Sequence, residues 1–248
     1  FHYRWNTQLF AAKGYVVACV NYHGSSGFGH AFLDSITHRW GDLELQDIEA
    51  GTDWLLKHSW ADQRRVFATG GSYGGYMVAW MNGHVAPGRY KAYVCHAGCF
   101  DWEAMFSNEA YTWHAKELGA WYWDDPVKVR SQSPSSFVSA MRTPTLVVHG
   151  ALDYRVPDQQ GLAYYNTLKA KGVDARLLWF PDENHWILKP RNPRPWYGEL
   201  FPCLTLVTAP RPPLPPAACA RFWPAPLPRA PLPGPRTHRK PGPVGPWG

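Results

Sequence analysis

The sequence predicts an α/β fold in which a mostly parallel β-sheet is covered by helices on both faces. Two observations support this prediction: short apolar runs recur along the chain, and stretches long enough to form helices separate them. With 248 residues and 45% hydrophobic content, the chain is large enough for one sizeable core. The apolar runs fall at residues 15–20, 64–70, 90–98, 143–150 and 175–180.

The first part of the chain is expected to pass from helix to strand and back to helix. Apolar residues repeat at helical spacing from Phe1 to Ala12, and residues 15–20 (YVVACV) then predict a buried strand. A glycine-rich loop follows at 21–29. Apolar residues along one face predict a helix over 41–58.

The second part is expected to continue the alternation. The apolar run at 64–70 predicts a strand that leads directly into a helix over 73–85. Another helix is predicted over 157–172, because Pro157 lies near its start and Gly172 follows its end. The remaining strands are those at 90–98, 143–150 and 175–180.

Charge and cysteine content argue against several classes of function. The formal net charge is +6, but basic residues outnumber acids by five from residue 199 onward, so the rest of the chain is nearly neutral. Nucleic-acid binding is therefore not expected. Five cysteines without a CxxC pair indicate neither a disulfide framework nor a zinc site, and Cys95 and Cys99 are expected to be small buried residues. No apolar run is long enough for a membrane span, and the first residues give no indication of localisation.

Residues 190–248 differ in composition from the rest of the chain. Of the 24 prolines, 18 lie from Pro190 onward, among many Ala, Arg and Gly residues. Because proline lacks a backbone N–H and restricts its neighbours, we expect a disordered tail there, outside a folded domain of residues 1–189. An alternative is a polyproline II ligand, since PxxP spacings occur between Pro212 and Pro216.

One serine lies between two pairs of glycines, directly after a predicted strand and before a predicted helix. The residues from Gly70 to Gly74 (GGSYG) fit the GxSxG pattern of a nucleophile elbow, with Ser72 at its centre. Such a turn is sharp and strained, and side chains two residues before or after the serine would collide with the neighbouring strand and helix. The backbone N–H of Tyr73, at the helix start, could then face a developing oxyanion.

A serine nucleophile requires a histidine base and a carboxylate that orients it. Asp153 follows the strand at 143–150, and His185 follows the strand at 175–180, so both are expected at the same edge of the sheet as Ser72. Taken alone, Asp153 could instead form a turn or helix cap, and His185 could be an ordinary loop histidine. Other candidates suit the order Ser, Asp, His less well, and we expect structural roles or longer distances for His96, His149, Asp101, Asp124 and Asp125.

These residues resemble the catalytic domain of the prolyl oligopeptidase family of serine peptidases, in the branch of acylaminoacyl-peptidases and dipeptidyl-peptidase-5-like enzymes. The resemblance covers about residues 1–189 and rests on VNYHGSSGFG, WGDLELQDIEAGTDWL, GGSYGGYM, LVVHGALDYRVP and FPDENHWI. It implies an α/β-hydrolase fold with Ser72 as nucleophile, Asp153 as orienting acid, His185 as general base and the Tyr73 N–H as an oxyanion donor. It also implies hydrolysis of peptide bonds near the N-terminus of short peptides, with no metal or organic cofactor.

The chain departs from the family pattern at both ends. In the family, a strand upstream of Phe1 supplies a second oxyanion donor and lies between the strands at 15–20 and 64–70. Its absence would leave the fold incomplete at the N-terminus, so we expect this chain alone to fold poorly. The family continues after Glu199 into a final amphipathic helix, whereas this sequence becomes rich in Pro, Ala and Arg. Our hypothesis for that change is a shifted reading frame or an assembly error in GC-rich coding DNA, and no core contacts are expected beyond it.

Two other functions remain open at this point. The same three residues would serve an esterase or acyl hydrolase, and an inactive fragment or a Pro-rich interaction protein would not use them. Aromatic residues are frequent between Phe100 and Trp123, which suggests either an apolar substrate pocket or ordinary packing. Glu103 or Glu109 could bind a free amino group of the substrate.

Overall fold

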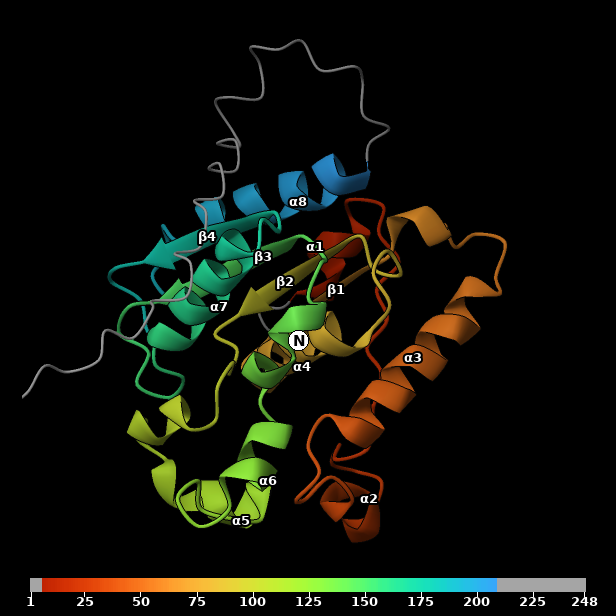
Figure 1. Ribbon diagram of the computed structural model, residues 1–248. Coiled ribbons are helices and arrows are strands. Elements are labelled where there is room, and N and C mark those ends of the chain that lie inside the picture. Colours follow the sequence, from red (N-terminus) through yellow and green to blue (C-terminus); the bar gives the residue numbers. More distant parts are fainter. Residues whose placement is uncertain (1–5, 209–248) are drawn as a thin grey trace, which may run out of the picture. The chain divides into compact units, whose positions relative to one another are not determined.

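The computed structural model describes residues 6–208, which contain a four-stranded parallel sheet (Figure 1). Its strands follow one another in the order of the sequence, so each new strand is added at the same side of the sheet. They are β1 (Phe67–Gly71), β2 (Ala92–His96), β3 (Thr145–Gly150) and β4 (Ala175–Phe180). The strands predicted at 64–70, 90–98, 143–150 and 175–180 are therefore confirmed.

The register places the carboxyl ends of all four strands at one edge of the sheet. Gly71, the last residue of β1, pairs with His96 of β2, and His96 pairs with Val148 of β3. Gly150, the last residue of β3, pairs with Phe180 of β4. The loops that follow β1, β3 and β4 consequently leave from the same edge, where α/β proteins bind their ligands.

Helices cover both faces of this sheet, as the sequence predicts. On one face lie α3 (Asp42–Leu56), α4 (Tyr73–His84) and α7 (Gln159–Ala170), and on the other lie α1 (Thr7–Ala11) and α8 (Pro193–Thr208) (Figure 1). Short helices occur in the connections, at α2 (His30–Asp34), α5 (His114–Leu118) and α6 (Pro126–Ser131). Short 3₁₀ segments occupy Gln63–Arg65, Ala104–Ser107, Tyr111–Trp113 and Pro134–Ala140, the last of them with a kink at Phe137.

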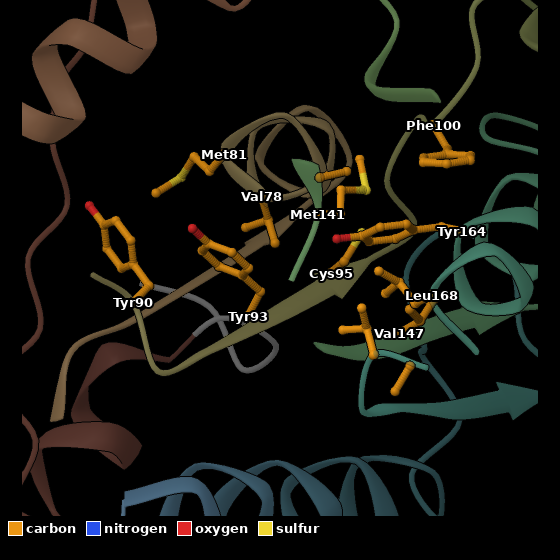
Figure 2. Packing of buried hydrophobic residues seen from close by; sticks show 13 residues of the cluster. Val78, Met81, Tyr90, Tyr93, Cys95, Phe100, Met141, Val147, Tyr164 and Leu168 are labelled. Carbon is orange, nitrogen blue, oxygen red and sulfur yellow. The ribbon is translucent and has the colours of Figure 1, made fainter. Parts of the chain in front are cut away.

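Alternate residues of each strand supply the two halves of the core. Tyr93 and Cys95 of β2 join a cluster with α4 and α7, in which Tyr164 and Leu168 are fully buried (Figure 2). Val94, between them, points to the opposite face and packs with residues of α8. Because parallel strands with both faces covered are buried on both sides, β2 and β3 are apolar throughout most of their length.

The strand predicted at residues 15–20 is not formed. These residues have no regular secondary structure, and the side chain of Val16 is 68% exposed. A cavity of about 650 Å³ lies beside β1, and it is lined by residues 13–20, by Phe67, and by parts of α3 and α4. A strand is stable only when a neighbour pairs with its backbone, and no described strand lies next to this segment.

The prediction that the folded domain ends near residue 189 is wrong for residues 193–208. They form α8, and its buried residues Trp196, Leu200 and Leu204 pack against the sheet. The expectation of no core contacts after Glu199 is therefore also wrong for Leu200 and Leu204. The spacing of four residues puts these side chains on one face, which outweighs the local effect of three prolines in the helix. The prediction of a disordered tail and its PxxP spacings otherwise concerns residues 209–248, which lie outside the described residues.

Candidate active site

Ser72 lies on the turn between β1 and α4, in a backbone conformation that L-residues rarely adopt. Its φ is 58° and its ψ is −117°. Gly70 permits this turn, because a Cβ at Gly70 would lie 2.3 Å from the backbone oxygen of Gly74. This steric reason does not apply to Gly74, since a Cβ there would meet nothing within 4 Å. The steric argument from the sequence therefore holds for Gly70 and is wrong for Gly74.

The structure brings Ser72, His185 and Asp153 into one hydrogen-bonded chain. The Oγ of Ser72 lies 2.9 Å from Nε2 of His185, and Nδ1 of His185 lies 2.7 Å from Oδ2 of Asp153. The serine follows β1, the aspartate follows β3 and the histidine follows β4. The common edge of the parallel strands thus brings together residues that are up to 113 positions apart in the sequence.

The carboxylate of Asp153 is buried and accepts hydrogen bonds at both oxygens. Its Oδ1 accepts hydrogen bonds from the backbone N–H groups of Arg155 (3.0 Å) and Val156 (2.8 Å). Burial alone would raise the pKa of Asp153, but interactions with His149, His185 and the Val156 N–H outweigh it and hold the pKa well below its usual range. Asp153 is therefore ionised at neutral pH, as a group that orients an imidazole must be.

His149, expected to be structural, contacts the same carboxylate. It is completely buried, and its Nε2 lies 2.8 Å from the carbonyl oxygen of Val156 and 3.5 Å from Oδ2 of Asp153. Since a carbonyl only accepts, Nε2 carries the proton. The ring also lies directly against Gly161, where a Cβ would come within 2.4 Å of Nδ1. His149 thus helps to hold the loop that carries Asp153.

Tyr73 is the first residue of α4, where backbone N–H groups have no acceptor within the helix. Its side chain is fixed by Glu44, whose Oε1 accepts a hydrogen bond from the Tyr73 hydroxyl and another, at 3.1 Å, from the N–H of Gly41. Burial raises the pKa of Glu44. Sequence reasoning missed Glu44, because it is one of several acidic residues in the helix 41–58 and only the fold brings it next to Tyr73.

The aromatic segment after β2 has both buried and exposed parts. Trp102 is buried and contacts the rings of Trp40 and Tyr76, which is ordinary core packing. Trp121 and Trp123 stack with centroids 5.0 Å apart, and Trp123 is 53% exposed. Both residues suggested as ligands of a substrate amino group already have partners: Glu103 pairs with Arg130 at 2.6 Å, and Glu109 pairs with Arg155 at 2.7 Å.

The remaining sequence candidates have structural surroundings. Cys95 and Cys99 are buried free thiols, as expected, and burial raises the pKa of Cys95 to about 12. Asp101 and Asp125 accept hydrogen bonds from backbone N–H groups three residues later, as caps do. Among residues 6–208 no cluster of His, Cys, Asp and Glu could hold a metal ion, and none of the helices there combines the length and the apolar character needed to cross a membrane.

A parallel sheet with a serine on a strained strand-to-helix turn, and with an aspartate and a histidine after later strands, defines the α/β-hydrolase class. Within that class, the chain belongs to the prolyl oligopeptidase family, whose model matches residues 1–202.

Among curated relatives, the chain is 40% identical over 200 residues to dipeptidyl-peptidase 5 of Schizosaccharomyces pombe, covering 80% of this chain and 29% of that protein. It is 36% identical over 204 residues to dipeptidyl-peptidase 5 of Porphyromonas gingivalis, covering 80% and 30%. The chain therefore spans less than a third of the length of these relatives.

Solved structures of acylaminoacyl peptidases are similar. The enzyme of Pyrococcus horikoshii superposes with a TM-score of 0.77 at 27% identity, covering 84% of this chain and 34% of that one. An acylaminoacyl peptidase in complex with Z-Gly-Gly-Phe-chloromethyl ketone gives a TM-score of 0.72 at 30% identity, covering 79% and 33%. These similarities confirm the α/β-hydrolase fold and the family expected from the sequence motifs.

Proposed function

We propose that this chain is the catalytic part of a serine peptidase that hydrolyses peptide bonds of short peptides. The observation that supports this most strongly is the hydrogen-bonded chain from Ser72 through His185 to Asp153, in a protein of the prolyl oligopeptidase family. A serine hydroxyl is a weak nucleophile at neutral pH, and this arrangement is the one that activates it.

In this proposal each residue has a defined step. Ser72 Oγ attacks the carbonyl carbon of the peptide bond while Nε2 of His185 takes its proton, and Asp153 stabilises the imidazolium that forms. The Tyr73 N–H donates to the carbonyl oxygen as it becomes negative. His185 then gives the proton to the leaving amine, which leaves an acyl-enzyme on Ser72. A water molecule, deprotonated by His185, releases the acyl group and restores Ser72.

The names of the relatives guide the choice of substrates. Dipeptidyl-peptidase 5 and acylaminoacyl peptidase are both names of enzymes that act on peptides, and one related structure holds a peptide chloromethyl ketone that ends in Phe. The stacked rings of the half-buried Trp121 and the exposed Trp123 would suit an apolar side chain of the substrate. We therefore propose short peptides with an apolar residue before the cleaved bond.

The proposal is tested by labelling with a fluorophosphonate probe, which reacts with activated serines. We expect the wild-type chain to be labelled, Ser72→Ala to be unlabelled, and Z-Gly-Gly-Phe-chloromethyl ketone to compete with the probe. A folded wild-type chain that is not labelled would refute the proposed nucleophile. If the labelled chain hydrolyses p-nitrophenyl esters but neither a dipeptidyl nor an N-acetylated aminoacyl p-nitroanilide, it is an esterase with the same three residues.

A further inference from the structure

We propose that Glu183 is a positioning residue for His185, and that its carboxylate holds the loop after β4 in the shape that presents the imidazole to Ser72. This inference rests on the proposed function, because it concerns the residue proposed as the general base. Glu183 lies two positions before His185, between the end of β4 and the start of α8. It is not one of the three residues joined by the hydrogen bonds from Ser72 through His185 to Asp153.

We call residues 181–192, between β4 and α8, the histidine loop. The carboxylate of Glu183 closes this loop by three hydrogen bonds. One oxygen accepts from the backbone N–H of Leu188 at 2.8 Å. The other accepts from the backbone N–H of Lys189 at 2.9 Å and from Nδ2 of Asn192 at 2.5 Å. The side chain of Glu183 thus spans the loop from its start to its end, with His185 inside the closed segment. Glu183 is only 2% exposed, so water does not compete for these bonds.

The closed segment contains a strained residue next but one to His185. Ile187 has a φ of 47°, a conformation that is unfavourable for a β-branched side chain. Its side chain is buried in the core beneath α8. A residue persists in such a conformation only when its surroundings impose it, and the bonds from Glu183 to Leu188 and Lys189 fix the backbone directly after Ile187.

Glu183 also joins the histidine loop to the loop that carries Asp153. Its backbone oxygen accepts a hydrogen bond from the N–H of Leu152 at 2.9 Å. The two loops approach so closely that a Cβ at Gly150 would lie 2.5 Å from that same oxygen. One residue therefore determines the shape of the histidine loop through its side chain and the spacing of the two loops through its main chain.

A carboxylate is required here because all three partners are donors. Replacing Glu183 by Gln would keep the size of the side chain but turn an NH₂ group toward a backbone N–H, so at least one bond would become a contact between two donors. Asp182, the preceding residue, offers a matched control. Its carboxylate pairs with the side chains of Lys189 and Arg191 and also accepts a hydrogen bond from Nδ2 of Asn192 at 3.2 Å. These partners are side chains, whereas Glu183 binds two backbone N–H groups of the loop.

The first measurement needs no catalytic turnover. The proton on Nδ1 of His185, held against Asp153, gives a proton NMR signal far downfield when the bond is formed. We expect this signal in the wild-type chain and in Asp182→Asn, and its loss or displacement in Glu183→Gln at a temperature where circular dichroism shows a folded chain. An unchanged signal in folded Glu183→Gln overturns the proposal, whether or not the wild-type chain is active.

The second measurement separates positioning from general destabilisation. With a p-nitroanilide that the wild type hydrolyses, we expect Glu183→Gln to lower kcat about 10- to 100-fold, the effect of a small displacement of a reacting group, with KM nearly unchanged. In a His185→Ala background the same substitution should change the residual rate less than about 2-fold, since residues that act as a unit are not additive. Equal losses in both backgrounds overturn the proposal.

If Glu183→Gln does not fold, Asn192→Ala decides the question, because it removes one of the three donors and leaves the loop backbone intact. A displaced Nδ1 proton signal together with a several-fold lower kcat supports the proposal, and wild-type values for both overturn it. Failure of the proposed function gives a different result: a wild-type chain that is folded, shows the Nδ1 signal, and is neither labelled nor active.

Discussion

The strained backbone at Ser72 predicts an unusual order of stability for two variants that lack the Ser72 hydroxyl. Ser72→Ala and Ser72→Gly both remove the hydroxyl, but only glycine removes the Cβ. A φ of 58° with a ψ of −117° is the geometry of the first central residue of a type II′ turn, a position that glycine favours. For other residues such a conformation costs about 1–3 kcal/mol. The advantage of glycine in the folded state is reduced by roughly 0.5–1 kcal/mol, because glycine gives the unfolded chain more conformational freedom and so lowers the free energy of unfolding.

The difference leaves Ser72→Gly more stable than Ser72→Ala by about 0.5–2 kcal/mol. For a domain of this size that corresponds to a Tm higher by roughly 1 to 8 °C, measurable by calorimetry or circular dichroism. Ser131, exposed in the last turn of α6, provides the control, because its φ is not positive and the glycine variant there should be the less stable one. Equal stabilities at Ser72, or a more stable Ser72→Ala, would show that the turn stores no strain.

Three further predictions concern the surroundings of the three residues. Gly161→Ala would put a Cβ 2.4 Å from Nδ1 of His149 and displace the ring from the Asp153 loop, so we expect kcat/KM to fall about 10-fold or more in steady-state assays. Because the pKa of Asp153 is lowered by folding, its ionisation stabilises the protein above the unfolded pKa, and this contribution is lost as pH falls through the folded pKa. Urea unfolding at neutral and acidic pH should therefore show a larger loss of stability in acid for the wild type than for Asp153→Asn, and equal losses would contradict the assignment. Gly70→Ala should lower Tm markedly while Gly74→Ala leaves it nearly unchanged, since only the first Cβ would clash with backbone.

The positions of Ser72, Asp153 and His185 could be predicted because each follows a strand within a few residues. In a parallel sheet the strands end at one edge, so recognising the strands is enough to bring these residues together. The apolar runs that mark the strands are local features of the sequence. The strain at Ser72 was also predictable, because the strand, the glycines and the following helix leave only a sharp turn between them.

The features that sequence reasoning missed depend on contacts between distant segments. The run at 15–20 has the composition of a strand, but pairing requires a neighbour that the pattern does not describe. The prolines in residues 193–208 argue against a helix there, and for that reason α8 is missed. The four-residue spacing of Trp196, Leu200 and Leu204 does indicate a helix. Nothing local marks Glu183, since its three partners lie beyond His185 and meet it only when the loop closes.

The cavity beside β1 lies away from the hydrogen-bonded residues Ser72, His185 and Asp153. Ser72 is tied to the paired side of β1, because its N–H donates to the carbonyl oxygen of His96 in β2 at 2.9 Å. Asp153 and His185 leave from β3 and β4, whose register is fixed through β2. None of these three positions depends on hydrogen bonds at the other edge of β1, where the cavity lies. Incomplete burial at that edge should therefore lower the stability of the chain, while the relative placement of Ser72, His185 and Asp153 is maintained by the four strands that are present.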